Sequence, residues 1–98
     1  MKVNMDQMMV DFDGDPIKDE KDQPWQLKKL LVSSLCAQLE IDKNVSADAA
    51  VKRWKFANRL HDGGEQELTP EEASELRDRL PRCYAVILSG QACEMLKG

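Results

Sequence analysis

The segment 51–60 constrains the fold more than any other, because it lacks proline and glycine and repeats its apolar residues at helical spacing. Four apolar residues recur every three positions: Val51, Trp54, Ala57 and Leu60. That spacing keeps them on one side of a helix with about 3.6 residues per turn. We expect a helix over 46–62, capped by Ser46, whose apolar side around Trp54 is covered by the rest of the chain.

The other side of this helix is basic, and it carries Lys52, Lys55 and Arg59. Cationic side chains on one helix face can contact nucleic-acid phosphates, and Trp54 and Phe56 are of the type that stacks on bases. The same pattern is typical of a solvated face over an aromatic core. Two interpretations therefore remain open, a solvated surface and the contact face of a small nucleic-acid-binding regulator.

The clearest local signal begins at Thr69 and predicts the start of a helix. Thr69 can cap that helix, a proline follows at the first helical position, and Glu72 occupies the position of a reciprocal capping box. We expect a helix over 70–80. Pro81 should break or kink it, because proline disfavours the α conformation of the residue before it. A last helix is expected over 81–96.

The N-terminal part has the pattern of β structure. Segment 8–12 is largely apolar and leads into Asp13 and Gly14, a pair typical of hairpin turns because glycine adopts positive φ without cost. Segment 15–18 is then the return strand. The short segment 65–68 can add a third strand to this hairpin. No internal repeat is apparent in the sequence.

A leucine-rich helix is expected over 25–39, because four leucines recur at every fourth position: Leu27, Leu31, Leu35 and Leu39. The chain has 98 residues, which is the size of one domain with a modest core. The predicted fold is therefore a single α+β domain over 1–98. It consists of an N-terminal β-hairpin, or a three-stranded antiparallel sheet that includes 65–68, packed on three to four α-helices.

Composition excludes several classes of protein. The net charge of -4 argues against a general binder of polyanions. No run approaches the roughly 20 apolar residues of a membrane span, and the first residues turn acidic before any signal-peptide core develops. The three cysteines are odd in number and lie in apolar helical segments, which is typical of reduced, buried thiols. We therefore expect a cytoplasmic protein.

The acidic segment 11–22 invites comparison with a calcium-binding loop. With Asp11 at position 1 of a twelve-residue loop, aspartates also fall at positions 3, 5, 9 and 12. Position 6, which needs glycine for its sharp turn, holds Pro16, and position 12 holds Asp22 in place of a bidentate glutamate. The pattern favours a hairpin with a solvated acidic tip, and cation binding by the Asp11–Asp22 loop is the alternative.

No catalytic residue, cofactor site or metal site is predicted. His61 is the only histidine, and it lies at a helix end beside two glycines. Cys83 or Cys93 could pair with it as a nucleophile, but their apolar settings favour inert thiols. Glycine-rich phosphate loops and nucleophile-elbow motifs are missing from the sequence. We therefore expect a protein that is not an enzyme.

Several short motifs follow one another along the chain: a strand with an Asp-Gly turn and then Ile-Lys-Asp (12–19), a leucine-rich helix, a helix that ends in glycine (52–64), Leu-Thr-Pro-Glu-Glu (68–72) and Gly-Gln-Ala with a leucine four residues on (90–96). In this order they resemble a loose group of small phage and prophage proteins. Only the connector 23–25 departs from the pattern. The resemblance implies a partner-binding role in assembly or host modulation, with another protein or a second copy as partner, and it carries over no site residue.

Overall fold

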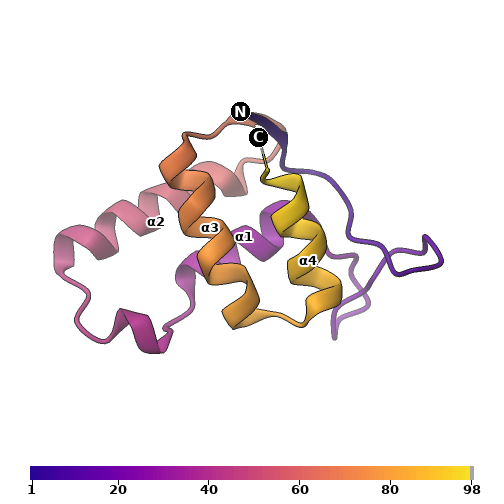
Figure 1. Ribbon diagram of the computed structural model, residues 1–98, viewed down its shortest axis with the longest axis horizontal. Coiled ribbons are helices and arrows are strands. Elements are labelled where there is room, and N and C mark those ends of the chain that lie inside the picture. The colour runs from indigo at the N-terminus through magenta and orange to yellow at the C-terminus, as the bar shows by residue number, and fades with distance from the viewer. Residues whose placement is uncertain (98) are drawn as a thin grey trace.

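The structure is a computed structural model, and it describes residues 1–97. Within them the chain forms two short strands, four α-helices and one 3₁₀ helix, in this order: β1 (Lys2–Asn4), α1 (Leu27–Cys36), η1 (Glu40–Asp42), α2 (Ala47–His61), β2 (Glu65–Glu67), α3 (Pro70–Cys83) and α4 (Val86–Met95) (Figure 1). The predicted α+β class is confirmed. No helix of this part of the chain has both the length and the apolar character needed to cross a membrane.

The sheet differs from the predicted one. β1 pairs with β2 in an antiparallel register that places Lys2 opposite Glu67 and Asn4 opposite Glu65. Segment 65–68 therefore pairs with the beginning of the chain and does not extend the hairpin expected over 8–18. The prediction of a three-stranded sheet is wrong, because the described residues form one sheet of two strands.

The expected hairpin is a pair of tight turns with isolated β-bridges. The first turn covers residues 9–16 and is closed by Asp11, whose N–H donates to the Asp15 carbonyl at 2.8 Å. The Asp11 carboxylate accepts from the N–H groups of Asp13 at 2.9 Å and Asp15 at 3.0 Å. Gly14 has φ +87°, as the predicted Asp-Gly turn requires. The side chain of Asp11 thus occupies amides that a longer strand would need for pairing.

Residues 17–24 repeat the same turn. The N–H of Asp19 donates to the Gln23 carbonyl at 2.8 Å. The Asp19 carboxylate accepts from the N–H groups of Lys21 and Gln23, each at 2.9 Å. Asp22 takes the place of the glycine, with φ +59°. The chain therefore contains an eight-residue repeat, Met-Val-Asp-Phe-Asp-Gly-Asp-Pro followed by Ile-Lys-Asp-Glu-Lys-Asp-Gln-Pro. The expectation of no internal repeat is wrong.

The repeat brings three residues together, each eight positions from the next. The N–H of Ile17 donates to Met9, the N–H of Trp25 to Ile17, and the N–H of Met9 to Trp25, at 3.0, 2.9 and 2.8 Å to the respective carbonyls. These bonds form a closed ring. Met9 is fully buried, and the other two side chains pack against the core. The ring fixes both turns to the helical part of the molecule.

The helix α1, and not α2, is the centre of the core. It contacts both α2 and α3, and α3 in turn contacts α4. Four leucines of α1 are buried: Leu27, Leu30, Leu31 and Leu35. On α2 only Ala57 and Leu60 are buried, whereas the side chain of Trp54 is 62% exposed. The prediction that the chain covers the Trp54 side of α2 is therefore wrong.

Pro81 does not end a helix, in contrast to the prediction. The helix α3 continues through it to Cys83, and the chain breaks at Tyr84 before α4 begins. A proline has no N–H, so it leaves the carbonyl four residues earlier without its helical partner. That carbonyl belongs to Arg77, and the thiol of Cys93 on α4 donates to it at 3.8 Å. The contact with α4 therefore offsets part of the cost of Pro81.

The predicted helix starts are confirmed where side chains cap them. The Ser46 hydroxyl accepts from the N–H of Ala49 at 3.1 Å. Thr69 and Glu72 form the reciprocal capping box, with bonds of 3.1 and 2.9 Å.

A backbone test follows from the repeated turn. We expect Gly14→Val to lower the free energy of unfolding by about 1–2 kcal/mol, because a β-branched residue is strained at positive φ. An added Cβ meets no atom within 4 Å there, so the cost comes from the backbone alone. The matched change Asp22→Gly at the equivalent position should not lower it. Urea unfolding measures the free energy of unfolding of both variants. An equal decrease in the two would contradict the assignment of a positive φ to these two turn positions.

Candidate functional site

A buried arginine joins three elements at one end of the molecule. Arg79 of α3 is almost fully buried. Its Nε donates to the carbonyl of Ser34 and its Nη2 to that of Ala37, each at 2.8 Å. These two carbonyls belong to the end of α1, where the helix leaves its last carbonyls without partners. Arg79 therefore caps α1, which explains why that helix ends before the predicted Leu39.

The counterion of Arg79 is Asp42, the last residue of η1. Both Nη atoms of Arg79 lie 3.0 Å from the two carboxylate oxygens, a bidentate pair. The same carboxylate accepts from the N–H of Leu39 at 2.9 Å. Arg53 of α2 adds a second cation, with its Nη1 3.1 Å from Asp42 Oδ1. Helices α2 and α3 thus meet at one carboxylate, and Arg79 links the end of α1 to the same cluster.

These partners shift the titration of Asp42. The hydrogen bonds from Arg79, and then the one from the Leu39 N–H, hold the pKa of the Asp42 carboxyl far below its usual value. Burial acts in the opposite direction but is outweighed. The carboxylate is therefore charged at neutral pH, where it serves as the counterion of Arg79.

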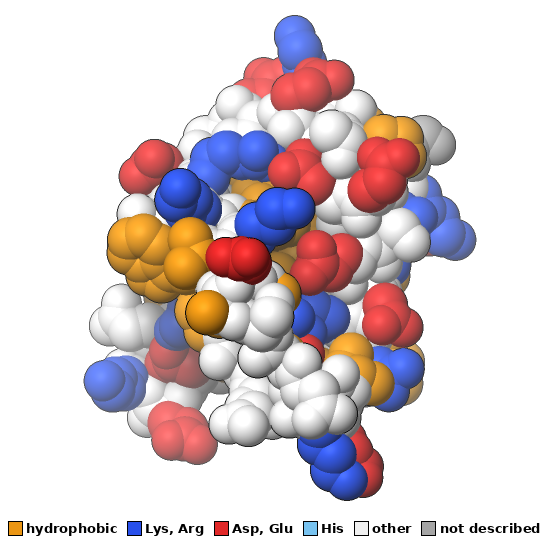
Figure 2. Space-filling model, turned by 90° about the vertical axis from the view of Figure 1, so that its left-hand side faces the viewer, with side chains coloured by type: hydrophobic (Ala, Val, Ile, Leu, Met, Phe, Trp, Pro, Cys, Tyr) orange, Lys and Arg blue, Asp and Glu red, His pale blue; other side chains and the backbone are white. Residues whose placement is uncertain are grey.

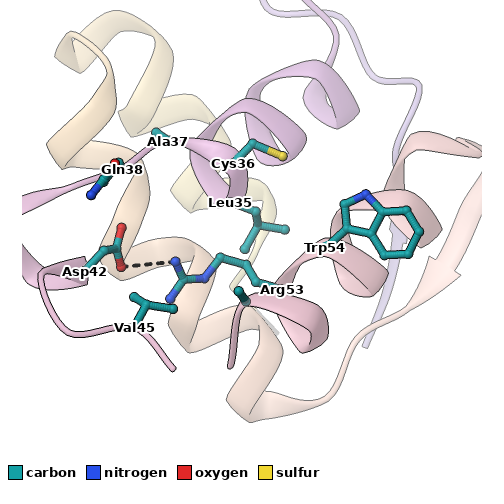
Figure 3. Close-up of a pocket in the computed structure, with 9 residues that line it drawn as sticks. Leu35, Cys36, Ala37, Gln38, Asp42, Val45, Arg53 and Trp54 are labelled. Atoms are coloured by element: carbon teal, nitrogen blue, oxygen red, sulfur yellow. Dashed lines mark ion pairs between the residues drawn. The ribbon is translucent and has the colours of Figure 1, made fainter. Parts of the chain in front are cut away.

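A groove of about 320 Å³ opens beside this cluster, between the end of α1, the η1 segment and α2. Figure 3 shows Arg53 reaching towards Asp42, with Leu35 and Val45 on either side and Trp54 further along the wall. The indole of Trp54 is 62% exposed. The groove therefore combines an apolar wall with a fixed, charged floor.

Further apolar side chains lie exposed on the same elements. Ile41 in η1 and Val51 in α2 are each about half exposed, and Val45 lies between them in the chain. Figure 2 faces this end of the molecule, where hydrophobic surface borders several Lys and Arg side chains. We call the groove together with Ile41, Val45, Val51 and Trp54 the Trp54 groove. Such an exposed apolar area on a small domain marks a candidate contact surface.

The predicted basic residues share a face of α2 but differ in their surroundings. Lys52 and Lys55 are exposed, and no ion pair involves them among the described residues. Arg59 Nη2 lies 3.0 Å from Glu72 of α3, and its guanidinium stacks 5.0 Å from the centre of the Phe56 ring. Only two of the three predicted contacts are therefore free to bind a ligand without first breaking an ion pair.

The remaining candidates do not converge on a site. The carboxylates of Asp11 and Asp19 accept hydrogen bonds from backbone amides of their own turns. Across residues 1–97, no three His, Cys, Asp or Glu side chains come close enough to hold a metal ion. The three cysteines are free thiols, and burial raises the pKa of the Cys83 and Cys93 thiols.

The residues of the ion-pair cluster were not predicted from the sequence. A signal was nevertheless present, because Arg79 lies three residues after the buried Leu76 and next to Leu80, on the apolar side of its helix. Arg53 likewise lies four residues before the buried Ala57. A cation at such a position predicts a buried carboxylate partner. Asp42 lies in the connector between the helices predicted over 25–39 and 46–62.

Comparison with protein-family models, with curated proteins and with solved structures finds no match to this chain.

The cluster predicts a large effect of Asp42→Asn on stability. Near neutral pH we expect the free energy of unfolding to fall by about 3–5 kcal/mol, because Arg79 would be left buried without its counterion. The contribution of Asp42 is fully present above its unfolded pKa of about 3.9, and it is lost as the pH falls through the lower folded pKa. The difference in the free energy of unfolding between wild type and Asp42→Asn should therefore shrink towards pH 2.

The matched control is Asp48→Asn, which removes an exposed carboxylate from the first turn of α2. That change should cost no more than about 1 kcal/mol. Urea unfolding at several pH values between 7 and 2 measures the free energy of unfolding of wild type, Asp42→Asn and Asp48→Asn. A difference between wild type and Asp42→Asn that stays constant over this range would contradict the assigned ion pair.

Proposed function

We propose that this protein acts without catalysis, by binding another protein chain in the Trp54 groove. The observation that supports this best is the exposure of Trp54 on a regular helix, beside a groove with a rigid floor. Tryptophan is enriched among the residues that dominate binding energy at protein interfaces. Leaving a large aromatic ring in water forgoes the stabilisation that its burial would provide. A partner that covers it recovers that stabilisation.

The form of the groove supports a short apolar segment as its ligand. Its walls come from α1, α2 and the η1 connector, and the ion pairs of Asp42 hold these elements together. A site that is already in its binding shape loses little conformational entropy when a partner docks. An apolar side chain can enter between Trp54 and Val45 while its neighbours remain at the rim.

The setting we propose is that of a phage or prophage protein, in an assembly or host-modulating role in the cytoplasm of the host. This part rests on the resemblance of the motifs between 12 and 96 to small phage proteins. Binding by an exposed groove is compatible with either role, because both need a surface that recognises another chain.

The proposal predicts that two opposite changes abolish binding. Trp54→Ala removes the wall of the groove, and Ala50→Trp fills it. We expect each variant to lose the proteins that the immobilised wild type retains from a bacterial lysate, as identified by mass spectrometry. Truncating a dominant interface residue typically weakens binding by more than about tenfold.

Val86→Ala is the matched control, because this apolar side chain of α4 is 82% exposed but does not line the groove. It should retain the same proteins as wild type. Both groove variants keep the fold, since neither position is buried, and circular dichroism checks this. Unchanged retention by Trp54→Ala and Ala50→Trp would refute the groove as the binding site.

A nucleic-acid-binding regulator is the second candidate, and the exposure of Lys52 and Lys55 on one face of α2 favours it. The ion pair of Arg59 with Glu72 and the net charge of -4 weigh against it. On this alternative the protein binds phosphates with the basic face of the helix 46–62.

This alternative predicts retention on immobilised DNA at low salt that falls as salt rises, because bound cations release counterions from the phosphates. The variant in which Lys52, Lys55 and Arg59 are all changed to Ala should then lose the retention. A protein that passes through at the lowest salt, or a triple variant that binds as well as wild type, would rule this surface out.

A further inference from the structure

A second unusual hydrophobic residue lies far from the groove, at the tip of the first acidic turn. Phe12 is 95% exposed. Carboxylates surround it in the sequence, with Asp11 before it and Asp13 and Asp15 after it. A large apolar ring presented in this way is a candidate for insertion into a complementary surface. We call residues 11–15 the Phe12 knob.

The knob is held in a fixed shape. The carboxylate of Asp11 accepts two backbone N–H groups from within the turn. The side-chain amide of Gln91 on α4 accepts from the N–H of Val10 at 3.1 Å and donates to its carbonyl. The base of the knob is therefore bound to α4 in the manner of a paired strand. Such preorganisation lowers the entropic cost of insertion into a partner.

The Trp54 groove has the size that the Phe12 ring requires. A cavity of about 150 Å³ is sufficient for a benzene ring, and the groove measures about 320 Å³. The additional space accommodates the backbone on either side of the ring. The indole of Trp54 offers an aromatic wall, against which a second ring can pack edge-to-face or in an offset stack.

The two surfaces also carry opposite charge. Residues 11–22 contain six carboxylates and two lysines. The helix α2, which forms one wall of the groove, contains four Lys or Arg residues and one carboxylate. Arg53 and Arg59 are held in ion pairs, so Lys52 and Lys55 supply the remaining positive charge. Long-range attraction between such regions favours the encounter that brings knob and groove together. The net charge of -4 makes α2 a local exception in an acidic protein.

The positions of knob and groove exclude their meeting within one molecule. The Cα trace extends 42 Å along its longest axis. Figure 1 shows the turn that follows β1 at one end of this axis, while η1 and the start of α2 lie at the other. Each copy of the chain thus carries the knob near one end and the groove near the other.

We propose that the ligand of the Trp54 groove is the Phe12 knob of a second copy of this chain. This proposal rests on the proposed function of the groove and names its partner. The contact joins two different surfaces, so two copies can exchange knobs in a two-fold dimer, or each copy can keep one knob and one groove free for further copies. In the second case the head-to-tail contacts generate closed rings or open filaments.

The decisive test uses two variants that each lack one half of the contact. Phe12→Ala has no knob, and Ala50→Trp has no groove. Light scattering after size exclusion, over protein concentrations up to the millimolar range, should show wild type as a dimer or a larger assembly and each variant alone as a monomer. An equimolar mixture should form a dimer and stop there, because only one productive contact is available.

Three further comparisons complete the test. An equimolar mixture of Phe12→Ala with Trp54→Ala should behave as the mixture of Phe12→Ala with Ala50→Trp does, because both groove variants keep the knob and lack the groove. Val86→Ala should associate as wild type does. Asp13→Asn combined with Asp15→Asn should weaken association several-fold at low salt and much less at high salt, because it removes charge and retains the ring. Variants that associate as wild type does when alone, or a mixture that remains monomeric, would overturn the proposal.

The two proposals fail in different ways. If the mixture stays monomeric while retention from a lysate still depends on Trp54, the self-contact is refuted and the groove keeps a foreign partner. If neither association nor retention responds to Trp54→Ala and Ala50→Trp, the groove is not a binding site. Association that depends on both Phe12 and Trp54 supports the self-contact, whatever the lysate contains.

Discussion

The ion pair between Asp42 and Arg79 determines the arrangement of the helices. Taking two charges out of water is costly, and an isolated buried pair gives little net stability. Here Arg79 also caps the end of α1, and Asp42 also bonds the Leu39 amide and Arg53. This set of bonds is satisfied only when α1, α2 and α3 take one relative position. The pair therefore specifies the fold more than it stabilises it.

The orientation of α2 follows from that constraint. Arg53 must face Asp42, and Trp54, the next residue, then lies about 100° from Arg53 around the helix axis and is left largely exposed. Hydrophobic periodicity alone favours the opposite orientation, with Trp54 inside. The exposure of Trp54 is therefore the cost of satisfying a buried carboxylate, and it leaves apolar surface at the rim of the groove.

Local signals in the sequence predicted local structure well. The caps at Ser46 and Thr69 mark true helix starts, and the Asp-Gly pair marks a true turn. The pairing of β1 with β2 was out of reach, since it joins residues more than 60 positions apart through three weakly patterned positions. Of the candidate site, the basic face of α2 was visible from spacing. The groove was not, because its floor depends on Arg79, which comes from another helix.

The dependence of the groove on Arg79 has a consequence for synthesis on the ribosome. The paired turns of residues 9–24 are closed by contacts over a few residues each, so they can form as soon as that segment emerges. The helices α1 and α2 emerge next, but Asp42 still lacks its bidentate partner until residue 79 has been added. A nascent chain can therefore close its acidic turns before its groove, whereas the Gln91 contact that fixes the base of the first turn forms only after the groove residues have been made.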